Sequence, residues 1–80
     1  MRELSVAWSD LNGLKRAKMT GLLKVRGYKE PFWVCDAWDE LMDAMDDGKP
    51  FVGHRVEGME PAAVILNPAH VASIEQHEKD

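Results

Sequence analysis

The sequence predicts a small α+β fold in which an antiparallel sheet or open barrel of about five strands is packed by one amphipathic helix. Several short runs alternate apolar and polar residues and are separated by turn residues, as half-buried strands are. One segment, near residues 36–47, instead has the period of a helix and many acidic residues. A chain of 80 residues has room for one core, so we expect residues 1–80 to form a single domain, with 77–80 as a frayed tail.

The first quarter of the chain begins with a predicted strand and continues into a segment with two interpretations. Residues 3–8 alternate in polarity, which indicates a half-buried strand. Asn12-Gly13 readily takes positive φ and favours a tight turn, whereas Ser9 could cap a short helix that ends at Gly21. Residues 9–20 are therefore predicted as either a hairpin or a helix.

The next two predicted strands form a hairpin. Residues 21–26 and 31–35 have the composition of strands, and residues 27–30 between them have the length of a hairpin loop.

The helix predicted over residues 36–47 has the most regular pattern in the chain. Its apolar residues recur at i, i+3, i+4 and i+7 and define the face toward the core: Trp38, Leu41, Met42 and Met45. Asp36 suits the N-cap position, and Gly48 followed by Lys49-Pro50 provides the stop.

Two further strands follow the helix. Residues 51–57 alternate, and residues 57–61 contain the glycine and proline of a turn. Residues 62–66 are apolar at every position, which predicts a central strand covered on both faces.

The end of the chain also has two interpretations. Asn67-Pro68 could be the N-cap and first residue of a C-terminal helix. It could also be a turn into a strand over residues 70–75 that pairs back on 62–66. We favour the strand, because Val71 and Ile74 are β-branched.

The run from residue 64 to residue 75, VILNPAHVASIE, resembles the strand, Asn-Pro turn, strand segment of small β-barrel proteins such as the FlbD flagellar family. The resemblance covers about a dozen of the 80 residues and contains no catalytic motif. It implies a small β-barrel and no particular activity.

Composition restricts the classes of protein to consider. No apolar run approaches the roughly 18 residues of a membrane span, and the first residues lack the pattern of a signal peptide, so we expect a cytoplasmic protein with no membrane partner. Cys35 is the single cysteine, which excludes an intrachain disulfide and a thiolate zinc site. A domain this small gains stability from self-association, so a homodimer is expected.

Charge is divided along the chain. Residues 1–35 carry seven Lys or Arg against three acids, a net charge of +4, while residues 36–80 carry three against eleven, a net charge of −8. Such asymmetry can serve a charged partner, or it can let one half of the fold pair with the other.

The predicted helix carries six carboxylates opposite its apolar stripe and no Lys or Arg: Asp36, Asp39, Glu40, Asp43, Asp46 and Asp47. Like charges at i, i+4 each destabilise a helix by a few tenths of a kcal/mol, roughly 0.2–0.5. The set can be a solvated face, a surface that docks on a basic patch of a partner or of residues 15–29, or a mimic of a nucleic-acid backbone that inhibits a DNA-binding protein. Metal binding is disfavoured, because the carboxylates lack an EF-hand loop and a histidine partner.

A basic segment is the competing candidate. Six cationic residues lie near Tyr28, Phe32 and Trp33, a mixture of charge and aromatics that nucleic-acid binders use: Lys15, Arg16, Lys18, Lys24, Arg26 and Lys29. The overall pI of about 5.3 argues against this function.

Little in the sequence indicates catalysis. His54, His70 and His77 share no metal-ligand spacing, and Cys35 next to Val34 is typical of a buried small hydrophobe. Phosphate-loop and nucleophile-elbow motifs are absent, so we expect neither an enzyme nor a cofactor.

These observations predict a small non-enzymatic interaction or regulatory protein of bacterial or bacteriophage type that docks a charged face on another protein. The predicted partner-binding residues are the six carboxylates of the helix. Nucleic-acid binding by residues 15–29 is the alternative. The three tryptophans are large for so small a core, so one or two are expected to be partly exposed.

Overall fold

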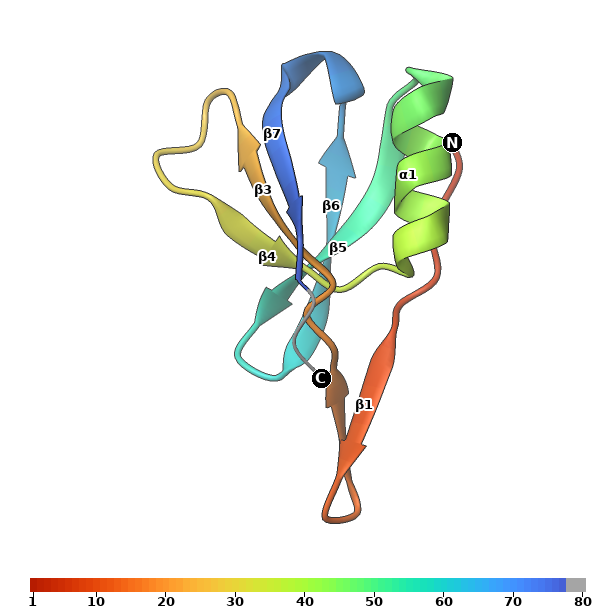
Figure 1. Cartoon of the computed structure of the whole chain (residues 1–80), viewed down its shortest axis with the longest axis vertical. Coiled ribbons are helices and arrows are strands. Elements are labelled where there is room, and N and C mark those ends of the chain that lie inside the picture. The colour runs from red at the N-terminus through yellow and green to blue at the C-terminus, as the bar shows by residue number, and fades with distance from the viewer. Residues whose placement is uncertain (78–80) are drawn as a thin grey trace.

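The computed structural model describes residues 1–77 and confirms an α+β fold of antiparallel strands with one α-helix (Figure 1). In chain order the described elements are β1 (Trp8–Leu11), β2 (Leu14–Ala17), β3 (Gly21–Val25), β4 (Phe32–Val34), α1 (Trp38–Asp47), β5 (Phe51–Glu57), β6 (Glu60–Leu66), the 3₁₀ turn η1 (Pro68–His70) and β7 (Val71–Gln76).

The main sheet is an open barrel. Its five strands pair antiparallel in the order β6-β5-β4-β3-β7, so the two edge strands are consecutive in the sequence and are joined by η1. A flat sheet would hold its edges about 19 Å apart at four strand spacings. A three-residue 3₁₀ turn advances only about 6 Å. The sheet must therefore curl to bring β6 and β7 together, as Figure 1 shows.

The predicted hairpin of residues 21–35 is confirmed, and the predicted turn near residues 57–61 joins a second hairpin. β3 pairs with β4 with Leu22 opposite Trp33, and β5 pairs with β6 with Val52 opposite Ile65. The second hairpin turns at Gly58, which has a positive φ of 66° and supplies the conformation that the tight turn needs.

The positions of the two edge strands differ from the predictions. β7 is a strand, as favoured, but it pairs with β3, with Leu23 opposite Ile74, and not with residues 62–66. β6 is an edge strand and not a central one, and Ile65 on it is 65% exposed. The prediction of a central strand was wrong because an apolar run shows which residues suit a strand but not how many neighbouring strands it has.

The N-terminal residues 2–7, here called the N-terminal strap, replace most of the strand predicted over residues 3–8. The strap makes isolated bridges from Glu3 to Val52 and from Val6 to Asp36, and the regular strand begins only at Trp8. Leu4 is buried, as the alternation predicts, but Trp8 is 46% exposed. The strap bonds first to β5 and then to the end of β4, so it cannot continue one regular ladder.

Helix α1 begins at Trp38 rather than at Asp36. Ala37 occupies the N-cap without a side-chain hydrogen bond, and Gly48 ends the helix in the left-handed conformation, as predicted. Asp36 is fully buried and does not cap the helix. The predicted apolar face is confirmed: Leu41 is buried, and Trp38, Met42 and Met45 pack against the core.

The core lies between the curled sheet, the strap and α1 (Figure 1). Its buried members come from all three: Leu4, Leu23, Val25, Phe32, Val34, Leu41, Ala44, Phe51 and Leu66. The expectation for the tryptophans is met, because Trp8 is exposed and the other two are half-buried.

At the C-terminus, Gln76 ends β7 and the amide of His77 donates to the carbonyl of Thr20 at 3.0 Å. The rest of the predicted frayed tail, residues 78–80, lies outside the described residues. Within the described part of the chain, α1 is too short and too polar to cross a membrane.

Candidate functional site

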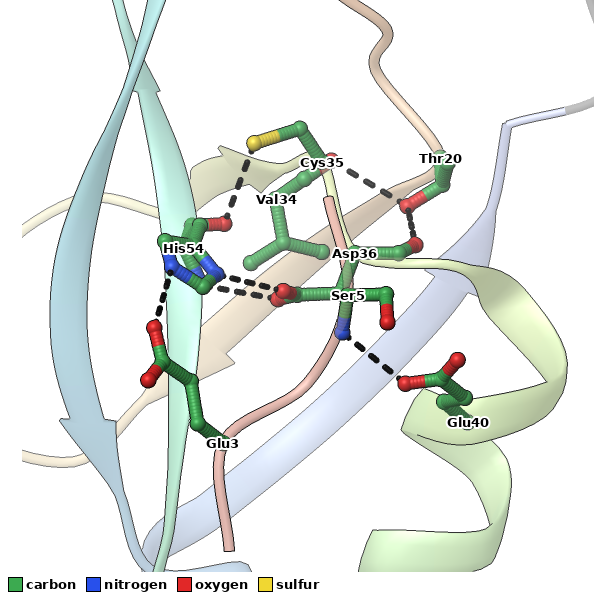
Figure 2. A network of polar contacts seen from close by, with 8 residues as sticks. All are labelled: Glu3, Ser5, Thr20, Val34, Cys35, Asp36, Glu40 and His54. Atoms are coloured by element: carbon green, nitrogen blue, oxygen red, sulfur yellow. Dashed lines mark hydrogen bonds and ion pairs between the residues drawn. The ribbon is translucent and has the colours of Figure 1, made fainter. Parts of the chain in front are cut away.

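The most deeply buried polar group of the molecule is a carboxylate–imidazole pair between the end of β4 and the middle of β5 (Figure 2). One carboxylate oxygen of Asp36, Oδ1, lies 2.8 Å from Nδ1 of His54, and the other, Oδ2, accepts the backbone N–H of the same histidine at 2.8 Å. Asp36 is fully buried and His54 is 8% exposed. The pair therefore joins two strands through both a side chain and a main-chain group.

Two neighbouring residues hold or accommodate this pair. The hydroxyl of Thr20 donates to the Asp36 carbonyl at 2.6 Å and approaches the Val34 carbonyl at 3.3 Å. Gly53, which precedes His54, leaves room for the carboxylate, because a Cβ there would lie 2.8 Å from Asp36 Oδ2. A glycine within a strand often marks such a close approach.

Burial dominates the electrostatics of the pair. It raises the pKa of Asp36 above its ordinary value of 3.8, because the ionised carboxylate loses its hydration. The hydrogen bonds and charge of His54 oppose that shift in pKa, and the nearby Glu40 adds to it.

The outer nitrogen of the imidazole faces a second carboxylate. His54 Nε2 lies 3.3 Å from Oε2 of Glu3, whose side chain is 66% exposed. The imidazole therefore has a carboxylate at each ring nitrogen, a hydrogen-bonded one at Nδ1 and a longer ion-pair contact at Nε2. The imidazole thus attaches the N-terminal strap, through Glu3, to the β4–β5 pair (Figure 2).

This network ties the N-terminal strap to the β4–β5 pair. Its outward nitrogen faces Glu3, and two surface hollows near the hairpin are lined by other residues. Cys35 is fully buried, as predicted, with its Sγ 3.6 Å from the His54 carbonyl. Burial, with a smaller contribution from the charge of Asp36, raises the pKa of the Cys35 thiol to about 11, so the thiolate that a nucleophile requires is suppressed.

The other histidines do not join the network. His77 packs edge-on against Trp33 with ring centroids 5.0 Å apart, and His70 is exposed on η1. Among residues 1–77, no three histidine, cysteine or acidic side chains are placed to hold a metal ion.

Three of the six predicted partner-binding carboxylates are engaged within the molecule. Asp36 is buried, so it does not lie on the exposed face of the helix as predicted. Asp43 forms a 2.8 Å ion pair with Arg2, and Glu40 accepts the backbone N–H of Ser5 at 2.9 Å. Both partners belong to the strap and not to residues 15–29.

The remaining carboxylates of α1 stay open to solvent. Asp39, Asp46 and Asp47 are exposed, and none has an ion pair within the described chain. Together with Asp43, they are called the helix face below.

The basic segment does not fold into one patch. Three of its cations lie on or next to β2, at the far tip of the molecule, whereas Arg26 and Lys29 belong to the β3–β4 loop at the opposite end (Figure 1). Lys15 is already engaged, with its Nζ 5.1 Å from the centre of the Trp8 ring. The predicted combination of cations and stacking aromatics is therefore divided.

The hairpin of β1 and β2 projects from the barrel (Figure 1). Its strands pair with Leu11 opposite Leu14, and the two residues between them, Asn12 and Gly13, have φ values of 56° and 78°. Positive φ at both positions is the signature of the two-residue turn that matches strand twist. The hairpin interpretation of residues 9–20 is confirmed, and the helix interpretation is wrong.

The two faces of this hairpin differ in chemistry. Directly opposite residues of an antiparallel pair point to the same side, so the register sorts the side chains. One side carries Trp8, Asp10, Lys15 and Ala17, in which Lys15 covers Trp8 and lies across from Asp10. The other side, called the hairpin face below, carries Ser9, Leu11, Leu14 and Arg16 and continues into Lys18.

The hairpin face is apolar and cationic and contains no acid. Leu11 is 51% exposed and Leu14 is 64% exposed. Arg16 and Lys18 form no ion pair within residues 1–77. Exposed apolar side chains therefore lie beside cations that have no counter-ion in the described residues.

A groove runs from this face to the start of α1. A hollow of about 360 Å³ is lined by Ser9, Leu11, Arg16, Ala17, Lys18, Met19 and His77. A second hollow of about 230 Å³ is lined by Ala7, Lys18, Met19, Thr20, Ala37, Trp38, Gln76 and His77. The two share Lys18, Met19 and His77, so they adjoin and form one open groove.

Sequence reasoning missed the hairpin face, although a signal was present. Leu11 and Leu14 flank Asn12-Gly13, and Leu14, Arg16 and Lys18 alternate. If residues 9–20 had been assigned to a hairpin, this pattern would have placed the leucines and both cations on one side.

Comparison with known proteins gives no relative: no protein family, no curated protein and no solved structure matches the chain. The similarity of residues 64–75 to the FlbD family therefore transfers no function, and any function must be argued from the chain's own surfaces.

Proposed function

We propose that the chain is a small non-enzymatic protein-interaction module that docks its hairpin face on a partner segment combining acidic and apolar side chains. The observation that carries the proposal is the pair of exposed leucines, Leu11 and Leu14, beside two cations that have no counter-ion in the described chain. Burial of these leucines would supply affinity, and the cations would select an acidic partner.

The anchoring of the hairpin supports this role. A lone two-stranded hairpin is marginally stable in water. Here the base of the hairpin is held by bonds from the Ala17 amide to the Met59 carbonyl at 3.0 Å and from the Lys18 amide to the Ala7 carbonyl at 2.9 Å. The tip lies outside the core cluster, so its side chains are free to meet another surface.

The helix face is a second candidate for docking. Asp39, Asp46 and Asp47 are exposed and lack ion pairs within residues 1–77, so they could meet a basic surface of a partner. The hairpin face is favoured over it because it offers apolar area as well as charge, and exposed ion pairs alone contribute only about 0–1 kcal/mol each.

Nucleic-acid binding is less favoured, since the cations are divided between two ends of the molecule and Lys15 is held on Trp8. A backbone-tracking site needs a continuous positive groove.

Selection from a random peptide library on the immobilised protein tests the proposal. We expect peptides enriched in Asp or Glu next to Leu, Ile or Phe, and we expect this enrichment to disappear with Arg16→Glu/Lys18→Glu. A matched control reverses Arg26→Glu and Lys29→Glu, which are exposed cations at the opposite end, and should keep the enrichment.

Three outcomes would contradict the proposal. Enrichment of Lys- and Arg-rich peptides would transfer the docking role to the helix face. Absence of any enrichment would remove peptide docking. A gel shift with DNA or RNA that weakens steeply with salt, and that both pairs of charge reversals abolish, would establish nucleic-acid binding instead.

A further inference from the structure

We infer that the partner of the hairpin face is the helix face of a second copy of this chain, so that two copies dock reciprocally. This inference rests on the proposed function and names the partner.

The two surfaces complement each other in charge. The hairpin face carries Arg16 and Lys18 and no acid, whereas the helix face carries four carboxylates of which only Asp43 has an ion pair in the described chain. The chain as a whole has a net charge of −4, so two copies repel each other at long range and the attraction has to come from the local match of these two surfaces.

The two surfaces cannot satisfy each other within one molecule. The hairpin projects from the lower end of the barrel, whereas α1 runs up the side of the barrel and ends at the top (Figure 1). The ion pairs of the described residues include none between the hairpin and α1, and the helix partner that is found is Arg2 of the strap. The hairpin tip and the C-terminal end of α1 can therefore meet only between two molecules.

Their lengths and apolar groups also fit. The ten residues of α1 extend about 15 Å, and each four-residue strand of the hairpin extends about 13 Å. Met42 and Met45 are half-buried on α1 and border the carboxylates, which gives Leu11 and Leu14 apolar neighbours. Methionine adapts readily to such contacts.

Reciprocity closes the assembly. In a two-fold dimer each interface patch is used twice, so the hairpin of one copy meets the helix of the other and the reverse. Both exposed surfaces are then covered, and the apolar area buried at the interface adds to that of the small core.

Charge exchange tests the inference, with the oligomeric mass read by light scattering and sedimentation at several concentrations. The wild-type chain, of 9.0 kDa, should form a dimer that weakens as salt is added. Variant A, Arg16→Glu/Lys18→Glu, and variant B, Asp46→Lys/Asp47→Lys, should each dissociate about tenfold or more readily, because each places like charges opposite.

Mixing variant A with variant B is the decisive experiment. In the mixture, each reversed hairpin meets an oppositely charged helix, so a heterodimer should form although neither variant dimerises alone. The control Arg26→Glu/Lys29→Glu should dimerise as the wild type does. Circular dichroism of each variant confirms the fold, and recovery on mixing excludes misfolding as the cause of dissociation.

The outcomes separate this inference from the proposed function. A monomeric wild type overturns the inference, as does a dimer that neither pair of reversals weakens or a mixture that stays monomeric. If the wild type is monomeric and still selects acidic peptides through Arg16 and Lys18, the proposed function stands and only the partner is wrong.

Discussion

The Asp36–His54 network and the β1–β2 hairpin place polar chemistry in opposite settings. In the network every carboxylate oxygen of Asp36 has a partner at 2.8 Å inside the molecule. On the hairpin face, the cations have no ion pair in the described chain, and the leucines beside them lie in solvent. The contrast teaches that charged groups in this chain have two settings: one set holds strands together, and another has no counter-ion within the described residues.

The largest effect on stability is expected from replacing Asp36. Asp36→Leu should lower the free energy of unfolding by about 1–3 kcal/mol, because the buried backbone N–H of His54 loses its acceptor and the ring nitrogen loses its hydrogen-bond partner. Urea denaturation measures this loss. Asp36→Asn is the matched control, since its amide can still accept from the backbone N–H, and a loss as large as that of the leucine variant would refute the hydrogen-bond explanation.

A glycine substitution in each region sharpens the contrast. Gly53→Ala should destabilise the protein by about 1–3 kcal/mol, because the new Cβ would lie 2.8 Å from Asp36 Oδ2 and 3.2 Å from a Leu66 methyl group. Gly13→Ala meets nothing within 4 Å, but its φ of 78° makes alanine strained by about 1 kcal/mol. Thermal unfolding of both variants should rank them in this order, and the reverse order would contradict the crowding described at Asp36.

The pH dependence of the free energy of unfolding also tests the network, with a smaller expected effect. Burial raises the pKa of Asp36 in the folded state above 3.8, so between 3.8 and the raised value the folded protein binds more protons than the unfolded chain. Stability therefore falls as pH rises through that window. The free energy of unfolding of the wild type should therefore fall relative to that of Asp36→Asn as the pH is raised from 3 upward. A difference between the two proteins that stays constant with pH would show that Asp36 does not titrate in this way.

The smallest effect on stability is expected at the hairpin face. Leu11→Ser/Leu14→Ser should change the free energy of unfolding by about 0.5 kcal/mol or less, because both side chains are already exposed and lie outside the core. The same variant should abolish peptide selection and dimerisation. A large loss of stability on denaturation would instead assign the two leucines to the fold.

Local patterns predicted the elements well where the deciding interactions are local. The apolar stripe of α1 and the left-handed stop at Gly48 depend on residues within a few positions of one another, as does the turn at Asn12-Gly13, which was one of two interpretations of residues 9–20. The β3–β4 hairpin and the turn between β5 and β6 were predicted for the same reason.

Features decided by distant residues were not predictable in this way. Asp36 has the residue type and position of an N-cap, but a histidine 18 residues later draws its carboxylate into the interior. The pairing of β7 with β3 and the edge position of β6 likewise depend on how the whole sheet curls, which no short window of sequence contains.

Both ends of the chain close the barrel over long separations. Leu23 pairs with Ile74 on β7, and Glu3 pairs with Val52, so strands near the two termini must find partners about fifty residues away. Contacts this distant in sequence slow folding and leave β3 without its outer neighbour until the last residues of β7 have left the ribosome. The native barrel is therefore completed only after synthesis of the chain has reached Gln76.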